Sequence, residues 1–296
     1  MSLPYYGEEV CSFSTQKGPC QNKAYYFFGN KLGCGVHIKN SERITLTKRS
    51  KKEVEEIKSD NHQAELDVIT AFQQINLARQ ARGDIVLCKI SMMKSPSHKE
   101  GYYNIYPNYK DGGRKDGLGC PALSPKSIGP IEHGQLGVLA SRNLENFHQG
   151  SKCYRHEVDV NGFPTGEFYA ARDRMFTDPE PHRHKIKGEK PLYSVWIDKK
   201  GGGHCLNYIQ SRQFYCNFYE RAVLQMPEFK YLQDILNKGV NIQICGYDAY
   251  EMKKEEIEKE YLNEKFPFGH ERVLFALLSI SDPNEYPWRK HKIFEF

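Results

Sequence analysis

Four residues near the start of the chain have the types and spacing of a metal site: Cys11, Cys20, Cys34 and His37. Three thiolates and one imidazole complete a tetrahedral zinc site. Cys34 and His37 are only three positions apart, so they need a tight turn, and the neighbouring glycines supply the backbone freedom for it. Because four protein ligands leave no position for a reacting water, we expect this zinc ion to be structural.

An alternative interpretation is that these cysteines are scattered core residues or form a disulfide. The segment also resembles small zinc modules of the form Cys…Gly-x-x-Cys-x-Asn-x-Ala…Cys-Gly-x-His. In this chain Asn22, Ala24 and the run Cys34-Gly35-Val36-His37 occupy the matching positions. The resemblance favours zinc but says little about activity, because such modules occur in many kinds of protein.

A second group of chemically capable residues lies between Leu144 and Lys152. On a helix, Glu145, His148, Gln149 and Lys152 fall at positions i, i+3, i+4 and i+7 and share one face. That face would carry a carboxylate, an imidazole, an amide and an ammonium group. The alternative is an ordinary solvated helix face with a Glu145–His148 pair.

The run from Glu145 to Lys152 resembles the signature Glu-His-Tyr-Phe-Gln-Ala-Gln-Lys of the NADAR superfamily (NAD- and ADP-ribose-associated domains). Glu145, Gln149 and Lys152 keep the spacing of that signature, and an aromatic residue is third, whereas Asn146 replaces its first histidine. Further on, the segment 219–232 is similar to the long helix of the family. Asp248 stands where the family has Asp-x-x-Trp-Gly, although the Trp-Gly is absent and residues 155–200 would be an insertion.

The resemblance implies an enzyme that cleaves an N-glycosidic bond between ribose and a base, in a nucleotide or an ADP-ribosylated nucleobase. Such cleavage builds positive charge on the anomeric carbon, so a carboxylate beneath the sugar would stabilise it and activate water. Glu145 is the candidate for this role, and Asp248 is the candidate second carboxylate. Gln149 and Lys152 are expected to hold ribose hydroxyls and phosphate.

Candidate contacts for a pyrophosphate lie on either side of the proline-rich turn 178–181. They are Arg172, Arg174, Arg183 and His184. For any one arginine the alternative is a surface ion pair. Trp196 and Trp288 are candidates for stacking a base, with a place in the core as the more common role of tryptophan.

Composition limits the class of protein. The 296 residues carry a net charge of +5, which is too small to require a nucleic-acid partner, although the basic run Thr47–Lys52 is a candidate contact for the phosphates of DNA or RNA. No apolar run reaches the roughly eighteen residues of a membrane span, and Glu8 and Glu9 do not suit a signal peptide. We therefore expect a cytoplasmic or nuclear protein with reduced cysteines and no membrane partner.

The pattern of apolar residues predicts an α+β fold, dominated by helices, with short strands and a small N-terminal zinc module. The expected domains are a zinc-binding module at 1–50, a helical connector at 51–84 and a NADAR-like catalytic domain at 85–296. Helices are predicted at 51–81, 144–154, 209–224, from 227 to 237, 251–263 and 270–280, and strands at 85–90, 192–197 and 240–245. A non-enzymatic nucleic-acid-binding or protein-interaction protein remains the alternative function.

Overall fold

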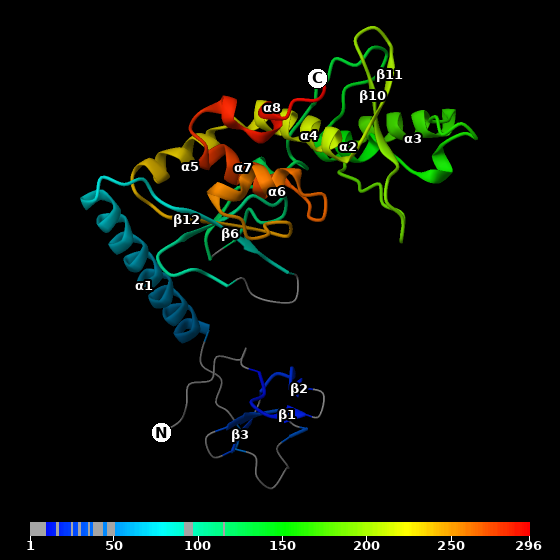
Figure 1. Cartoon of the computed structure of the whole chain (residues 1–296). Helices are drawn as coiled ribbons and strands as arrows, with labels where there is room; N and C mark the ends of the chain where they lie inside the picture. Colours follow the sequence, from blue (N-terminus) through cyan, green and yellow to red (C-terminus); the bar gives the residue numbers. More distant parts are fainter. Residues whose placement is uncertain are drawn as a thin grey trace. The chain divides into compact units, whose positions relative to one another are not determined.

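The computed structural model describes residues 10–15, 18–24, 26–28, 31–34, 36–37, 44–45, 51–91, 97–114 and 116–296. The chain divides into two compact units, Met1–Asp67 and Val68–Phe296. The division falls inside α1 (Lys51–Ala78), the long helix shown in Figure 1. The segment 51–84 is thus divided between the two units, whereas the sequence suggested a connector of its own.

The first unit is built from very short strands. β1 (Ser14–Thr15) pairs with β2 (Gly18–Pro19), and β3 (Tyr26–Phe28) lies between β4 (Lys31–Gly33) and β5 (Ile44–Thr45). The buried cluster among its described residues consists of three cysteine side chains with a phenylalanine against them. An apolar cluster of this size among the described residues stabilises little by itself, so a metal ion or another cross-link there would add to the stability of the unit. The side chains of the basic run Thr47–Lys52 lie outside the described residues.

The second unit contains a parallel sheet of four strands in the order β6-β12-β7-β8. The strands are β6 (Ile85–Lys89), β12 (Ile242–Gly246), β7 (Tyr103–Tyr106) and β8 (Leu118–Gly119). Because all four run in the same direction, their carboxyl ends meet at one edge. In open parallel sheets this edge is where ligands commonly bind.

Helices cover this sheet and build the core. α7 (His270–Ser279) packs on β6 and β12, and α4 (Tyr208–Val223) packs on α7 (Figure 1). The capping box of Asn207 and Gln210 sets the start of α4. α5 (Pro227–Asn237) begins with proline at its first position and is followed by Gly239, whose positive φ of 84° ends the helix.

A second, antiparallel sheet has the order β11-β10-β9. Its strands are β9 (Lys152–Cys153), β10 (Tyr193–Ile197) and β11 (Gly203–Leu206). α2 (Leu144–Gly150) and α3 (Gly166–Thr177) pack against each other, and α4 contacts both α2 and β10 (Figure 1). α4 therefore links the two sheets.

The remaining elements are short. They are η2 (Pro121–Leu123), η3 (Arg155–Glu157), η4 (Lys254–Glu256), α6 (Ile257–Leu262), η5 (Pro283–Glu285) and α8 (Pro287–Lys290). α8 places Trp288 in the core, where its indole N–H donates to Glu220 at 2.6 Å. No helix in the described part of the chain combines the length and apolar character that crossing a membrane requires.

The α+β prediction is confirmed, and the helices predicted at 51–81, 209–224 and 270–280 are α1, α4 and α7. Apolar and polar residues alternate in the strand predicted at 240–245, a pattern typical of a half-buried strand. β12 is instead buried at every position, because it lies inside the sheet. Its Gln243 is accommodated by bonds to the carbonyl of Ser97 and the N–H of Lys99, both at 2.9 Å. The sequence did not predict α3, in which only three residues face the core.

Candidate functional site

A cavity of about 570 Å³ opens at the carboxyl edge of the parallel sheet. The segments that follow β7, β8 and β12 contribute to its wall through Asn108–Asp111, Ser124–Lys126 and Tyr247–Asp248. α2, α4 and the start of α7 complete the wall, together with the loop at 183–185. All of these segments belong to the second unit, so the cavity lies within one compact body.

The α2 side of the cavity carries the row of polar side chains that the sequence predicts. Asn143 caps α2 by accepting a bond from the backbone N–H of Asn146, which fixes the first turn and Glu145 within it. Gln149 donates to Glu145 Oε1 at 3.2 Å, and Lys152 Nζ donates to Gln149 Oε1 at 2.9 Å. The amine therefore orients the amide, and the amide holds the carboxylate.

Lys152 is not on the helix as predicted, because α2 ends at Gly150 and Lys152 begins β9. Its side chain still reaches the cavity. Burial lowers the pKa of Lys152 to about 8; Glu145 acts in the opposite direction and Arg183 in the same direction as burial. At neutral pH the amine is therefore close to its titration and can act as a cation or as a proton donor.

His148 completes this wall in an apolar setting. Its ring lies against Tyr215 and Phe214, with centroids 4.8 and 5.9 Å away. Burial lowers the pKa of His148 well below its ordinary value, so the imidazole is neutral at physiological pH. Its Nδ1 has no hydrogen-bond partner among the described residues, which leaves one buried polar atom beside the cavity.

The cavity is also lined by Asp248, as the sequence predicts, and by two residues that sequence reasoning missed, His270 and Glu271. Asp248 follows β12 and is half-buried, whereas Glu271 is only 1% exposed. The backbone N–H of Asp248 faces Glu271 Oε1 at 3.4 Å. The signal for Glu271 in the sequence was a carboxylate within an otherwise apolar helix, at its N-terminal turn.

Tyr215 from α4 was also missed. Burial raises its pKa well above the ordinary value, and the negative charges of Glu145 and Glu271 add to the effect. The phenol is therefore neutral and acts only as a neutral hydrogen-bonding group. Since both carboxylates influence its pKa, Tyr215 lies near each of them in the lining of the cavity.

Arg183 and His184 both line the cavity, as predicted, but in different states. The Arg183 side chain is 68% exposed, and its Nε lies 3.9 Å from Glu145 Oε1. His184 is held by Glu157, with Nε2 3.1 Å from Oε1. Arg183 is thus available to an anionic ligand, whereas His184 already has an acidic partner.

Asn146 anchors the loop that carries these two residues. Its side chain donates to the carbonyls of Asp178 and Glu180 at 3.0 and 2.8 Å and accepts from the N–H of His182 at 2.7 Å. Asn146 is fully buried, so these bonds are shielded from water. The residue that departs from the NADAR signature therefore has a positioning role in this chain.

Arg172 and Arg174 do not belong to the cavity, which corrects their predicted role as pyrophosphate contacts. Arg172 is 5% exposed and pairs with Asp173 at 2.9 Å, while Arg174 is exposed on α3. The helical period of α3 turns Arg172 into the core and Arg174 away from the core. Trp196 and Trp288 are buried in the core, so neither is available to stack a base.

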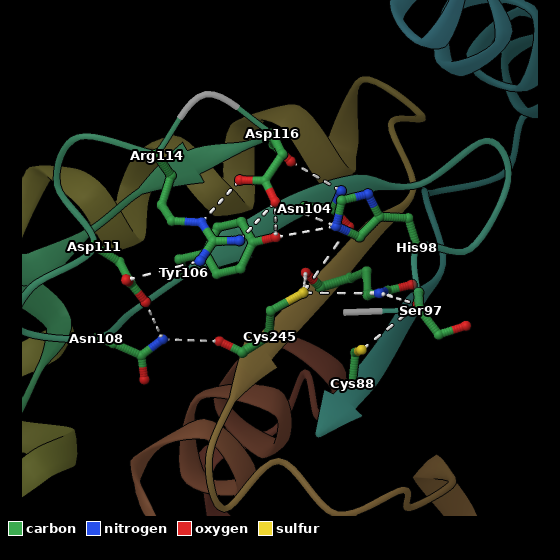
Figure 2. A network of polar contacts seen from close by, with 11 residues as sticks. Cys88, Ser97, His98, Asn104, Tyr106, Asn108, Asp111, Arg114, Asp116 and Cys245 are labelled. Carbon is green, nitrogen blue, oxygen red and sulfur yellow. Dashed lines mark hydrogen bonds and ion pairs between the residues drawn. The ribbon is translucent and has the colours of Figure 1, made fainter. Parts of the chain in front are cut away.

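A polar network supports the wall formed by the segment after β7 (Figure 2). Asn108 donates to Asp111 at 2.8 Å and to the carbonyl of Cys245 at 3.1 Å, which ties this segment to β12. Arg114 stacks on the Tyr106 ring at 3.9 Å and pairs with Asp116 at 2.6 Å. The described parts of the glycine-rich segment, 107–114 and 116–119, are therefore held in a defined shape beside the cavity.

The first unit contains a separate cluster of Cys11, Cys20, Cys34 and His37, whose ligand atoms all lie within 4.8 Å of one another. His37 Nδ1 is 3.2 Å from Cys11 Sγ and 3.4 Å from Cys34 Sγ, and the sulfurs of Cys20 and Cys34 are 4.0 Å apart. Ligands at tetrahedral zinc are separated by about 3.5–3.8 Å, so the donor set and its spacing fit a metal ion.

The turn from Cys34 to His37 also suits a thiolate ligand. Burial alone would raise the pKa of Cys34, but hydrogen bonds from the backbone N–H groups of Val36 and His37 lower it, to about 6. The Asn22 amide adds a bond to the same sulfur at 3.7 Å. These donors favour the charged form, which is the form that binds metal.

Comparison of the chain with protein-family models, with curated proteins and with solved structures found no match.

Proposed function

We propose that the second unit is an N-glycosidase that hydrolyses the bond between ribose and a base in a ribosylated or ADP-ribosylated nucleobase or nucleotide. The observation that carries the proposal is the cavity at the sheet edge, which is lined by Glu145, Asp248 and Glu271. The resemblance of the sequence to the NADAR signature at Glu145, Gln149 and Lys152 supports the same function.

Glu145 is the carboxylate that stabilises positive charge on the anomeric carbon and takes a proton from water. Gln149 holds Glu145 through Oε1, and no described residue forms a hydrogen bond with Oε2, so that oxygen is available for the reaction. Asp248 is the second carboxylate of this proposal and positions the sugar or the water. Together these groups fit hydrolysis with an oxocarbenium-like transition state.

Lys152 and Arg183 supply positive charge to the same space. A phosphate or pyrophosphate attached to the ribose would be attracted to the exposed Arg183 side chain, because a guanidinium binds such groups through two bonds. The half-buried Lys152 side chain also lines the cavity and suits a ribose hydroxyl or a phosphate oxygen.

For the first unit we propose a structural zinc ion held by Cys11, Cys20, Cys34 and His37. Thiolates with one imidazole are a donor set that zinc commonly takes, and four ligands close the coordination sphere. The ion would cross-link a unit with little apolar core.

The catalytic proposal is tested with Glu145→Gln on a panel of nicotinamide mononucleotide, inosine 5′-monophosphate and an ADP-ribosylated guanosine, with the released base measured by chromatography. We expect the purified wild type to hydrolyse at least one of them and the variant to lose at least about a hundredfold in turnover. Glu167→Gln is the matched control, because Glu167 also lies in the first turn of a helix but is exposed and outside the cavity. Wild-type turnover in Glu145→Gln would refute the proposal, and so would a wild type inert towards the whole panel.

A further inference from the structure

Three tyrosines line the cavity and are also exposed to solvent. Tyr109 follows β7 and is 41% exposed, Tyr208 begins α4 and is 45% exposed, and Tyr247 follows β12 and is 47% exposed. We call these three residues the tyrosine rim. They come from three segments far apart in the sequence, so the fold itself gathers exposed aromatic surface at one cavity.

The hydroxyl groups of the tyrosine rim form no hydrogen bond within the described residues. The Arg212 guanidinium lies 4.7 Å from the centre of the Tyr208 ring, and the Tyr208 side chain nevertheless stays exposed. Single exposed apolar side chains are ordinary on a protein surface. Three exposed tyrosines around one cavity are instead typical of a binding surface, where tyrosine is enriched.

The charged residues of the same lining differ in exposure according to their sign. Lys110, Arg183 and Lys185 are exposed, whereas the carboxylates are buried or partly buried. These carboxylates are Asp111, Glu145, Asp248 and Glu271. Lys110 and Lys185 form no ion pair with a described residue, and Arg183 approaches Glu145 only to 3.9 Å. The exposed part of the lining therefore offers positive charge to a ligand.

Exposed aromatic rings beside exposed cations are the combination by which proteins hold single-stranded nucleic acid. The rings stack on the bases, and the cations contact the phosphates of the backbone. A duplex suits this surface less, because its bases are already stacked on one another and offer no free faces. The cavity of about 570 Å³ has the size of a site for one small molecule, such as one nucleotide. A single nucleotide held there would leave the tyrosine rim without a base to stack on.

We propose that the tyrosine rim and the exposed cations beside it bind single-stranded nucleic acid, so that one nucleotide of the strand enters the cavity and its neighbours stack on the rim. This inference rests on the proposed function for the reaction inside the cavity, and it names the substrate class as a nucleotide within a strand. Lys110, Arg183 and Lys185 contact the phosphates on either side of that nucleotide. Stacking accepts every base, so binding depends little on sequence.

The test measures the fluorescence anisotropy of labelled single strands of about twelve nucleotides, one of DNA and one of RNA, titrated with the full chain. We expect saturable binding of at least one strand, and the comparison of the two shows whether the ribose 2′-hydroxyl is required. The corresponding duplex should bind at least about tenfold more weakly, because its bases cannot stack on the tyrosine rim. Adenosine 5′-monophosphate should displace the strand only at a much higher concentration than an unlabelled strand does.

Two kinds of variant separate stacking from charge. Tyr208→Ala and Tyr247→Ala should each weaken binding of the strand at least about fivefold, through loss of one stacked ring. Tyr231→Ala is the matched control, because Tyr231 is 47% exposed on α5 and does not line the cavity. The double variant Lys110→Gln with Lys185→Gln should reduce the slope of log affinity against log salt by about 1.4, or about 0.7 for each phosphate contact.

Equal affinity for strand and duplex would overturn the proposal, and so would wild-type affinity in both tyrosine variants. The second result is also the one expected if the basic run Thr47–Lys52 alone held the strand. In either case the N-glycosidase proposal would still stand for free nucleotides. A chain that binds the strands as described but hydrolyses nothing in the substrate panel would instead remove the proposed function and leave the nucleic-acid surface in place.

Discussion

The buried amine of Lys152 offers a direct test of the electrostatics of the cavity. Burial lowers its pKa from an ordinary value of 10.5 to about 8. Below pH 8 the amine is charged in both the folded and the unfolded chain, and the folded state bears the cost of the buried charge. Between about pH 8 and 10.5 the folded chain loses the proton while the unfolded chain keeps it, so the free energy of unfolding rises with pH.

The size of this rise follows from the difference between the two pKa values and is about 3 kcal/mol. Lys152→Met removes the titrating group and keeps a side chain of similar length. The measurement is urea unfolding of both proteins from pH 7 to 10.5, followed by tryptophan fluorescence. We expect the variant to be the more stable protein at pH 7 and to lose about 3 kcal/mol of that advantage by pH 10.5.

Other groups that titrate in this range are present in both proteins and cancel in the difference. Lys238→Met is the matched control, because Lys238 is fully exposed and paired with Asp234 at 2.7 Å, which raises its pKa. Its curve should show no such rise relative to wild type. Parallel stability curves for wild type and Lys152→Met would refute the reasoning that Lys152 is buried as a charged group.

Two further predictions concern the anchor of the loop and the metal site. Asn146→Ala removes three buried hydrogen bonds to the loop 178–182 and should lower the free energy of unfolding by about 3 kcal/mol, measured in urea; a loss below about 0.5 kcal/mol would contradict the anchoring role. The purified chain should contain one zinc ion, measured by elemental analysis, and Cys20→Ser should weaken its retention against a chelator about tenfold or more. A wild-type chain with no bound zinc after purification in zinc-containing buffer would exclude the site.

The local elements were largely predictable because their signals are local. Asn207 with Gln210, Pro227 and Gly239 mark helix ends through backbone hydrogen bonding and allowed φ values, which neighbouring residues decide. The four-ligand cluster was predictable for a related reason. Its residues are of metal-binding types and lie within one short segment of the sequence. Burial of β12 could not be read from its alternating sequence, because it depends on which strands lie beside it.

The catalytic candidates also divide into those that the local sequence identifies and those that only the fold identifies. Residue types and spacing placed Glu145, Gln149 and Lys152 together on one short segment, and the resemblance to the NADAR signature is what selected them as a candidate site. Residue types and spacing could not show that Arg183 lines the cavity whereas Arg172 is turned into the core by the helical period of α3. Residue types and spacing also did not select Glu271, because its signal was only a carboxylate in the first turn of a largely apolar helix, more than a hundred residues from Glu145.

What the sequence determined by itself was therefore the set of chemical groups and the helices and turns that carry them. Only the tertiary structure decided which groups share a space, because parallel strands distant in the chain bring their carboxyl ends to one edge. The same packing decided which groups are buried, and so lowered the pKa of Lys152 and placed the carboxylate of Glu271 in the interior beside the cavity. Burial and proximity are properties of the folded chain, and they turn a list of polar residues into a site.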